Sequence, residues 1–133
     1  SDLLAEAFAR LLPQLSERMT APDREAVARI VASPATRQLV AAAEDGRIVG
    51  LLSVALYDVP SGRKAWIEDV VVDAATRGRG IGEALVREAL ALARREGVAR
   101  VMLTSNATRR AAHRLYERMG FVRYETDCFR LDL

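Results

Sequence analysis

The sequence predicts an α/β fold in which helices cover both faces of a mixed β-sheet. Apolar residues recur at helical spacing in four segments, and β-branched or continuously apolar runs fill the stretches between them. The order is two helices, three strands, then a helix, a strand, a helix and two strands. Because helices and strands alternate in the second half, we expect helices on both sides of one sheet. The 133 residues suit a single domain over residues 1–133.

Two amphipathic helices open the chain. Leucine, alanine and phenylalanine at helical spacing predict the first over residues 1–15. The second is predicted over residues 22–33, because Pro22 fits the first turn of a helix and Pro34 ends it. Its inward-facing residues are expected to be Ala26, Val27, Ile30 and Val31.

Three strands follow, over residues 37–44, 47–57 and 65–73. Asp45-Gly46 is the strongest hairpin signal in the chain and joins the first two. The polar segment 58–64 predicts a longer second turn. Three consecutive valines near the end of the third strand predict burial on both faces.

The second half predicts a helix over residues 80–96 that Gly97 ends, and a short buried strand over residues 100–104. A last helix over residues 107–119 ends at Gly120. Two final strands are predicted over residues 121–124 and 128–131.

Composition excludes several classes of function. The net charge is only +2 and the arginines are scattered, so we expect no nucleic-acid partner. No apolar run could span a membrane, and acidic residues among the first leucines predict a helix rather than a signal peptide. One histidine and one cysteine cannot build a metal site. The lone Cys128 excludes an internal disulfide, fits a cytoplasmic location, and is expected to be a core thiol.

The most informative segment joins the valine-rich strand to the following helix. It reads R-G-R-G-I-G over residues 77–82, with three glycines at alternate positions and two arginines between them. A helix N-terminus carries unpaired N–H groups and partial positive charge, and glycines let a ligand approach the backbone. A tight turn with close helix–sheet packing is the simpler interpretation. The alternating glycines and arginines favour a phosphate-binding site.

The same segment resembles a known motif. Arg77, Gly78, Arg79, Gly80, Ile81 and Gly82 match the R/Q-x-x-G-x-G/A signature of the GNAT superfamily of acyl-CoA-dependent N-acetyltransferases. Asn106 and the later run from Ala112 to Phe121 are similar to that family's N…A-x-x-x-Y-x-x-x-G-F segment. The match extends from about Ile48 to the C-terminus, with the elements in the family's order.

The resemblance implies a GNAT-like, largely antiparallel sheet whose two central strands splay into a V-shaped slot. It also implies acetyl-CoA as co-substrate, with its pyrophosphate on the backbone from Arg77 to Gly82. The pantetheine arm would lie along the strand from Asp69 to Val72, with Val70, Val71 and Val72 as cofactor-binding residues, and would contact Asn106. The family suggests a homodimer. A strand usually precedes the first helix in this family, so we expect either residues missing before Ser1 or one strand fewer.

Acetyl transfer to an amine needs alignment, a base for the ammonium and an acid for the thiolate. Glu68 is the favoured base and Asp69 a close second; on a regular strand they face opposite sides unless a bulge intervenes. Either one could instead be a solvated strand-end residue. Tyr116 is predicted to protonate the thiolate, although a core tyrosine is the simpler alternative. The backbone N–H of Val70 or Val71 could stabilise the oxyanion.

Two other side chains invite functional interpretations. His113 could act as a base or orient Tyr116 but is expected to be a surface or capping residue, and Ser105 is expected to be a helix cap. The sequence thus predicts an N-acetyltransferase that acts on a primary amine by direct attack in a ternary complex. The alternative is a non-catalytic acyl-CoA-binding sensor, which would keep the glycines without requiring Tyr116.

Overall fold

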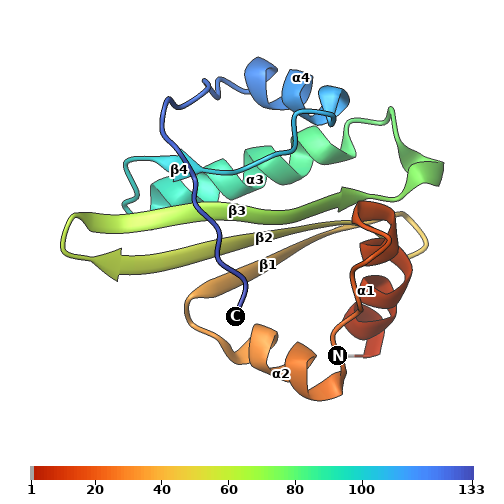
Figure 1. Ribbon diagram of the computed structural model, residues 1–133. Coiled ribbons are helices and arrows are strands. Elements are labelled where there is room, and N and C mark those ends of the chain that lie inside the picture. The colour runs from red at the N-terminus through yellow and green to blue at the C-terminus, as the bar shows by residue number, and fades with distance from the viewer. Residues whose placement is uncertain (1) are drawn as a thin grey trace.

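The computed structural model describes residues 2–133 and, within them, one four-stranded sheet. Its strands lie side by side in the order β1 (Thr36–Ala42), β2 (Ile48–Val59), β3 (Gly62–Val72) and β4 (Val101–Met102) (Figure 1). The first three pair antiparallel, whereas β4 runs parallel to β3. The mixed, largely antiparallel sheet predicted from the sequence is therefore confirmed.

Helices cover both faces of this sheet. The first pair, α1 (Asp2–Leu15) and α2 (Arg24–Ala32), packs on one face, and α3 (Ile81–Arg95) and α4 (Arg110–Arg118) lie over the other (Figure 1). A short 3₁₀ turn, η1 (Ala74–Thr76), connects β3 toward α3. Ser1, the predicted start of the first helix, lies outside the described residues.

The second helix starts later than the sequence predicted. Asp23 is its N-cap, and its carboxylate accepts a hydrogen bond from the Ala26 N–H at 2.8 Å. This cap leaves Pro22 outside the helix, because the N-cap residue itself has extended backbone. Val27 is buried as expected, but Val31 is 60% exposed and its predicted inward orientation is wrong.

The turn predicted over residues 58–64 is also wrong. The two strands continue to Val59 and Gly62, which face each other, so only two residues form the turn between them. Asp58 lies opposite Arg63, and its carboxylate accepts from the guanidinium at 3.0 and 3.1 Å. This cross-strand ion pair explains why a polar segment extends the hairpin instead of looping out.

The two predicted final strands do not form. Residues 121–133 contain no strand, and Val122, Phe129 and Leu131 are 85%, 91% and 83% exposed. Cys128 is exposed as well, which contradicts its prediction as a core thiol. A strand forms only where a neighbouring strand offers its backbone for pairing. The preceding strand, β4, is shorter than predicted and pairs over only two residues, so it offers little backbone to a further strand. Apolar alternation alone was therefore insufficient for pairing.

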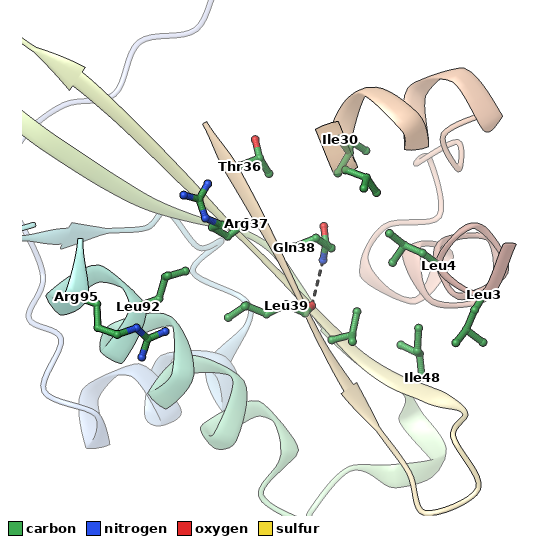
Figure 2. A pocket seen from close by; sticks show the side chains of 12 residues that line it. Leu3, Leu4, Ile30, Thr36, Arg37, Gln38, Leu39, Ile48, Leu92 and Arg95 are labelled. Atoms are coloured by element: carbon green, nitrogen blue, oxygen red, sulfur yellow. Dashed lines mark hydrogen bonds between the residues drawn. The ribbon is translucent and has the colours of Figure 1, made fainter. Parts of the chain in front are cut away.

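The outer edge of β1 borders an apolar hollow of about 550 Å³ (Figure 2). Leu3 and Leu4 of α1 and Ile30 of α2 line one side, and Leu92 of α3 lines the other. Its charged lining residues are Arg37 and Arg95, and no carboxylate of the described residues lines it. The hollow thus lacks a group that could accept a proton from a substrate.

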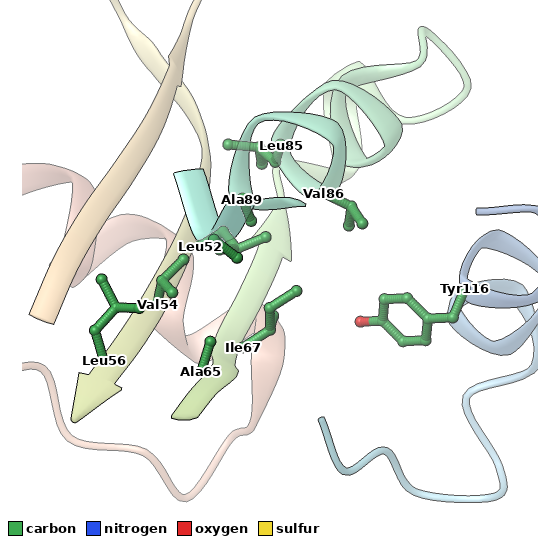
Figure 3. Close-up of a cluster of buried hydrophobic side chains, with 10 residues drawn as sticks. Leu52, Val54, Leu56, Ala65, Ile67, Leu85, Val86, Ala89 and Tyr116 are labelled. Atoms are coloured by element: carbon green, nitrogen blue, oxygen red, sulfur yellow. The ribbon is translucent and has the colours of Figure 1, made fainter. Parts of the chain in front are cut away.

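Two apolar clusters hold the layers together. One packs α1 and Val27 of α2 against Ile48, Leu51 and Val71 of the sheet. The other packs α3 and Tyr116 of α4 against the opposite face (Figure 3). Its buried members are Leu52, Val54, Leu56, Ala65, Ile67, Leu85, Val86, Ala89, Ala93 and Tyr116. Both clusters meet the sheet on β2 and β3, so these two strands fix the position of α3 and α1 relative to each other.

Gly50 lets α3 lie close to β2. A Cβ atom at this position would stand 2.9 Å from Leu85 Cδ1 and 3.0 Å from Ile81 Cγ2. We therefore expect Gly50→Val to destabilise the fold by about 1–3 kcal/mol through overpacking, lowering the Tm in thermal unfolding by several degrees. Ala42→Val, at an exposed position on β1, is the control. Equal melting temperatures for both variants would contradict this close packing.

Candidate functional site

A β-bulge interrupts β3 near its end. Leu51 faces Val71 and Ser53 faces Glu68, so two β3 residues, Asp69 and Val70, oppose one residue of β2. Asp69 has a φ of 50°, the left-handed conformation that aspartate tolerates better than most residues. A bulge leaves a residue unpaired and bends the strand. Beyond Trp66, β3 has no strand partner on the β4 side within residues 2–133, so the two strands separate there.

The loop after β3 leads directly into the N-terminus of α3. Asp73 caps the 3₁₀ turn, and Gly78 and Gly80 have φ values of 83° and 77°. Gly80 is the N-cap residue of α3, and no side chain caps the helix in the described part of the chain. The N–H groups of the first turn are therefore available to a ligand, together with the positive end of the helix dipole.

The Tyr116 side chain extends from α4 toward the sheet, and its hydroxyl is the part that points to the sheet (Figure 3). It is 8% exposed and packs edge-on against Phe121, with ring centroids 5.8 Å apart. Burial raises the pKa of Tyr116, although the positive charge of Arg109 opposes this shift. The phenol therefore stays protonated through the neutral range and keeps a proton that it can donate.

These elements border one cleft of about 690 Å³. Its walls come from the end of α1, the end of β3, the glycine loop with the first turn of α3, and α4 with the residues before it. Most of the residues predicted to bind the cofactor line it, as does Tyr116. They are Val70, Val71, Val72, Arg77, Gly78, Gly80, Ile81 and Gly82.

The remaining predicted site residues lie outside this lining. Arg79 is exposed, and Glu68 and Asp69 are exposed at the bulge. The side-chain oxygen of Asn106 accepts from both the N–H and the hydroxyl of Thr108 at 2.9 Å, which gives it a local turn role. The structure thus brings the glycine loop, the valines and Tyr116 together, but not these four residues.

The cleft carries excess positive charge that sequence reasoning missed. Arg109, Arg110 and Arg118 of the α4 region join Arg77 in its lining. The carboxylate that lines the cleft, Glu83, forms an ion pair with Arg87 at 3.1 Å. The adjacent arginines two helical turns before Tyr116 were the available signal. Such a lining suits a ligand with several phosphates, because guanidinium groups bind phosphate oxygens in pairs.

Glu68, beside the bulge, has an altered pKa. Partial burial raises the pKa of Glu68, and the negative charge of neighbouring Asp69 raises it further. A carboxylate with a raised pKa is a stronger base, which is the direction that proton abstraction requires.

Two polar side chains predicted to be helix caps or surface residues are partly buried instead. His113 Nε2 and Ser105 Oγ are buried and have no hydrogen-bond partner among residues 2–133. Arg109 is the N-cap residue of α4, so neither His113 nor Ser105 caps that helix.

Over residues 2–133 there is no group of three or more potential metal ligands of the His, Cys, Asp or Glu type. None of the helices in this range has both the length and the apolar character to cross a bilayer.

This combination of splayed parallel strands, bulge and glycine-led helix defines the class. The Acetyltransferase (GNAT) family matches residues 3–121, and the chain belongs to that family. A putative acetyltransferase from Agrobacterium tumefaciens has a similar structure, with a TM-score of 0.82 and 27% identity over 99% of this chain and 92% of that one. An acetyltransferase structure from Trypanosoma brucei gives a TM-score of 0.77 at 31% identity, over 97% and 92%.

Some sequence relatives carry more specific names. The rice glucosamine 6-phosphate N-acetyltransferase 1 is 35% identical over 90% of this chain and 75% of its own length. A mycothiol acetyltransferase from Thermomonospora curvata is 36% identical over 67% of this chain. The chain spans only 29% of that relative's length.

Proposed function

We propose that this chain is one acetyltransferase domain that moves an acetyl group from acetyl-CoA to a primary amine. One observation carries the proposal: a single cleft joins the glycine loop, the free edge of β3 and Tyr116. The positive lining supports a substrate with a pyrophosphate and a further phosphate, as acetyl-CoA has. The relatives' names support an amine on a small molecule, such as an amino sugar.

The reaction proposed is direct transfer within a ternary complex. The ammonium of the acceptor loses a proton to Glu68 or Asp69, directly or through water. Its nitrogen then bonds to the acetyl carbon, and the carbon–sulfur bond breaks. Tyr116 donates its proton to the departing sulfur and regains one from the amide nitrogen, directly or through water, while a backbone N–H of Val70 or Val71 stabilises the oxyanion.

Calorimetric titration with acetyl-CoA, run beside a thiol-release assay on a panel of amines, tests this proposal. The panel includes glucosamine 6-phosphate, other amino sugars, a lysine peptide and a free N-terminus. Binding with thiol release on one of these amines is the expected result. Binding without release across the panel would favour the sensor alternative, and no binding would overturn the acetyl-CoA assignment.

The proposed location is the cytoplasm, where acetyl-CoA is available and the exposed Cys128 stays reduced. The homodimer that the family suggests is part of the proposal, and light scattering of the purified protein tests it.

The like charge of Asp69 provides a pH test of the base. Asp69→Asn removes the charge that raises the Glu68 pKa and keeps a residue that tolerates a φ of 50°. We therefore expect the acidic limb of the kcat/KM profile to move to lower pH, because Glu68 then ionises at lower pH. Glu68→Gln should abolish that limb. An unmoved limb in Asp69→Asn would exclude Glu68 as the titrating base.

A further inference from the structure

The last turn of α1 holds the start of the glycine loop through one side chain. We propose that Gln14 is a positioning residue that fixes the loop after β3 in the shape that receives the pyrophosphate of acetyl-CoA. The inference rests on the proposed function, because the loop needs a fixed shape only if it binds that ligand. Gln14 and Leu15 also line the cleft, so α1 reaches the site itself.

The Gln14 amide bonds two consecutive residues of the chain. Its Oε1 accepts from the Ala74 N–H at 2.8 Å, and its Nε2 donates to Asp73 Oδ1 at 3.4 Å. That carboxylate oxygen also accepts from the Ala75 N–H at 3.2 Å. Because one planar amide holds both Asp73 and Ala74, it fixes the direction in which the chain leaves β3.

Asp73 is the second half of this contact. It is 8% exposed, and a buried carboxylate needs partners for its charge. The Ala75 N–H holds the pKa of Asp73 below its usual range, and Gln14 and Arg10 act in the same direction. Arg10 lies one turn before Gln14 on α1. Its Nη1 atom is 3.5 Å from Asp73 Oδ2, and its Nη2 donates to the Ile48 carbonyl at 2.9 Å.

The helix that carries Gln14 is held in place by the packing of its apolar face. Ala7, Phe8, Leu11 and Leu12 of α1 are buried in one of the two apolar clusters. The loop beyond Thr76, by contrast, contains Gly78 and Gly80, where an added Cβ would meet nothing within 4 Å. Such a segment has little packing to restrict it, so its shape depends on how its first residues are held. A loop ordered in advance binds more tightly, since less conformational freedom is lost on binding.

Gln14→Met removes both hydrogen bonds and keeps the side-chain length. We expect the dissociation constant for acetyl-CoA, measured by calorimetry, to rise about three- to tenfold. The KM for acetyl-CoA should rise by the same factor, while kcat at saturation stays within about twofold. Ala9→Met, which puts the same side chain on the exposed face of the same helix, is the matched control. It should bind as the wild type does.

An exchange of donor and acceptor separates positioning from a general structural effect. Gln14→Glu places a second carboxylate against Asp73, and Asp73→Asn removes the charge that Arg10 faces, so each single variant should bind acetyl-CoA more weakly. In the double variant the amide nitrogen at position 73 donates to the new carboxylate at position 14, which still accepts from Ala74, but it cannot accept from the Ala75 N–H as Asp73 Oδ1 does. We therefore expect partial recovery, with a loss of affinity smaller than the losses of the two single variants added together.

The outcomes distinguish this inference from the proposed function. If the wild type binds acetyl-CoA and Gln14→Met binds equally well, the positioning role is wrong and the proposed function stands. If the loss of acetyl-CoA affinity in the double variant equals the two single losses added together, the contact between Gln14 and Asp73 does not position the loop. If the wild type itself does not bind acetyl-CoA, the proposed function fails and the inference fails with it.

Discussion

Replacing Tyr116 with phenylalanine should lower kcat by about two to four orders of magnitude and leave the dissociation constant for acetyl-CoA nearly unchanged. The substitution removes only the hydroxyl. The ring still fills its place in the cluster beneath α3 and still packs edge-on against Phe121. Steady-state kinetics and calorimetry on the same preparation measure the two quantities separately.

The physical reason lies in the protonation state of the phenol. Burial raises the Tyr116 pKa, so the hydroxyl keeps its proton at every pH at which the enzyme would work. The same burial excludes water that could otherwise donate to a departing thiolate. Loss of this donor therefore leaves the leaving group without stabilisation, which affects the transition state and not the bound substrate.

Tyr57→Phe is the control, because Tyr57 is a partly exposed tyrosine on β2, outside the cleft. It should have unchanged kcat. An unchanged kcat in Tyr116→Phe would remove Tyr116 from the chemistry. A large loss of acetyl-CoA binding in that variant would instead indicate that the hydroxyl shapes the cleft.

The sequence predicted those parts of the site whose residues lie within one short, continuous segment of the chain. The glycine loop and the first turn of α3 are adjacent in the chain, so their spacing alone defines the local geometry. Tyr116 lies on a helix whose apolar side was readable from its period, and the structure buries it as that period requires. The position of the bulge could not be predicted from the sequence, because it is set by the pairing register of β3 with β2.

The parts that escaped prediction depend on contacts between distant segments. Gln14 lies 59 residues from Asp73, and nothing local indicates that the two side chains meet. From the sequence, the arginines of the α4 region were interpreted as solvated charges, whereas the fold places them around the cleft. The final strands failed for a related reason, since alternation shows which residues could pair but not whether an edge is available to them.

Gly82→Trp should abolish detectable binding of acetyl-CoA, a loss on the order of a hundredfold or more in affinity. Gly82 lies in the first turn of α3, and a Cβ there would stand 3.3 Å from Leu115 Cδ2 and 3.7 Å from Val72 Cγ2. Both neighbours line the cleft, so an indole at this position would extend into the space between α4 and β3. The helix itself tolerates the change, because Gly82 has no positive φ.

Gly82→Ala makes the experiment decisive. It adds only the Cβ, whose close neighbour is the flexible end of Leu115, and alanine stabilises a helix relative to glycine. We expect it to fold at least as well as the wild type and to keep most of its affinity. If Gly82→Trp melts like Gly82→Ala but does not bind, the ligand occupies this cleft. If Gly82→Trp binds acetyl-CoA as well as the wild type, the ligand lies elsewhere, and the roles assigned to the glycine loop and to Tyr116 are both wrong.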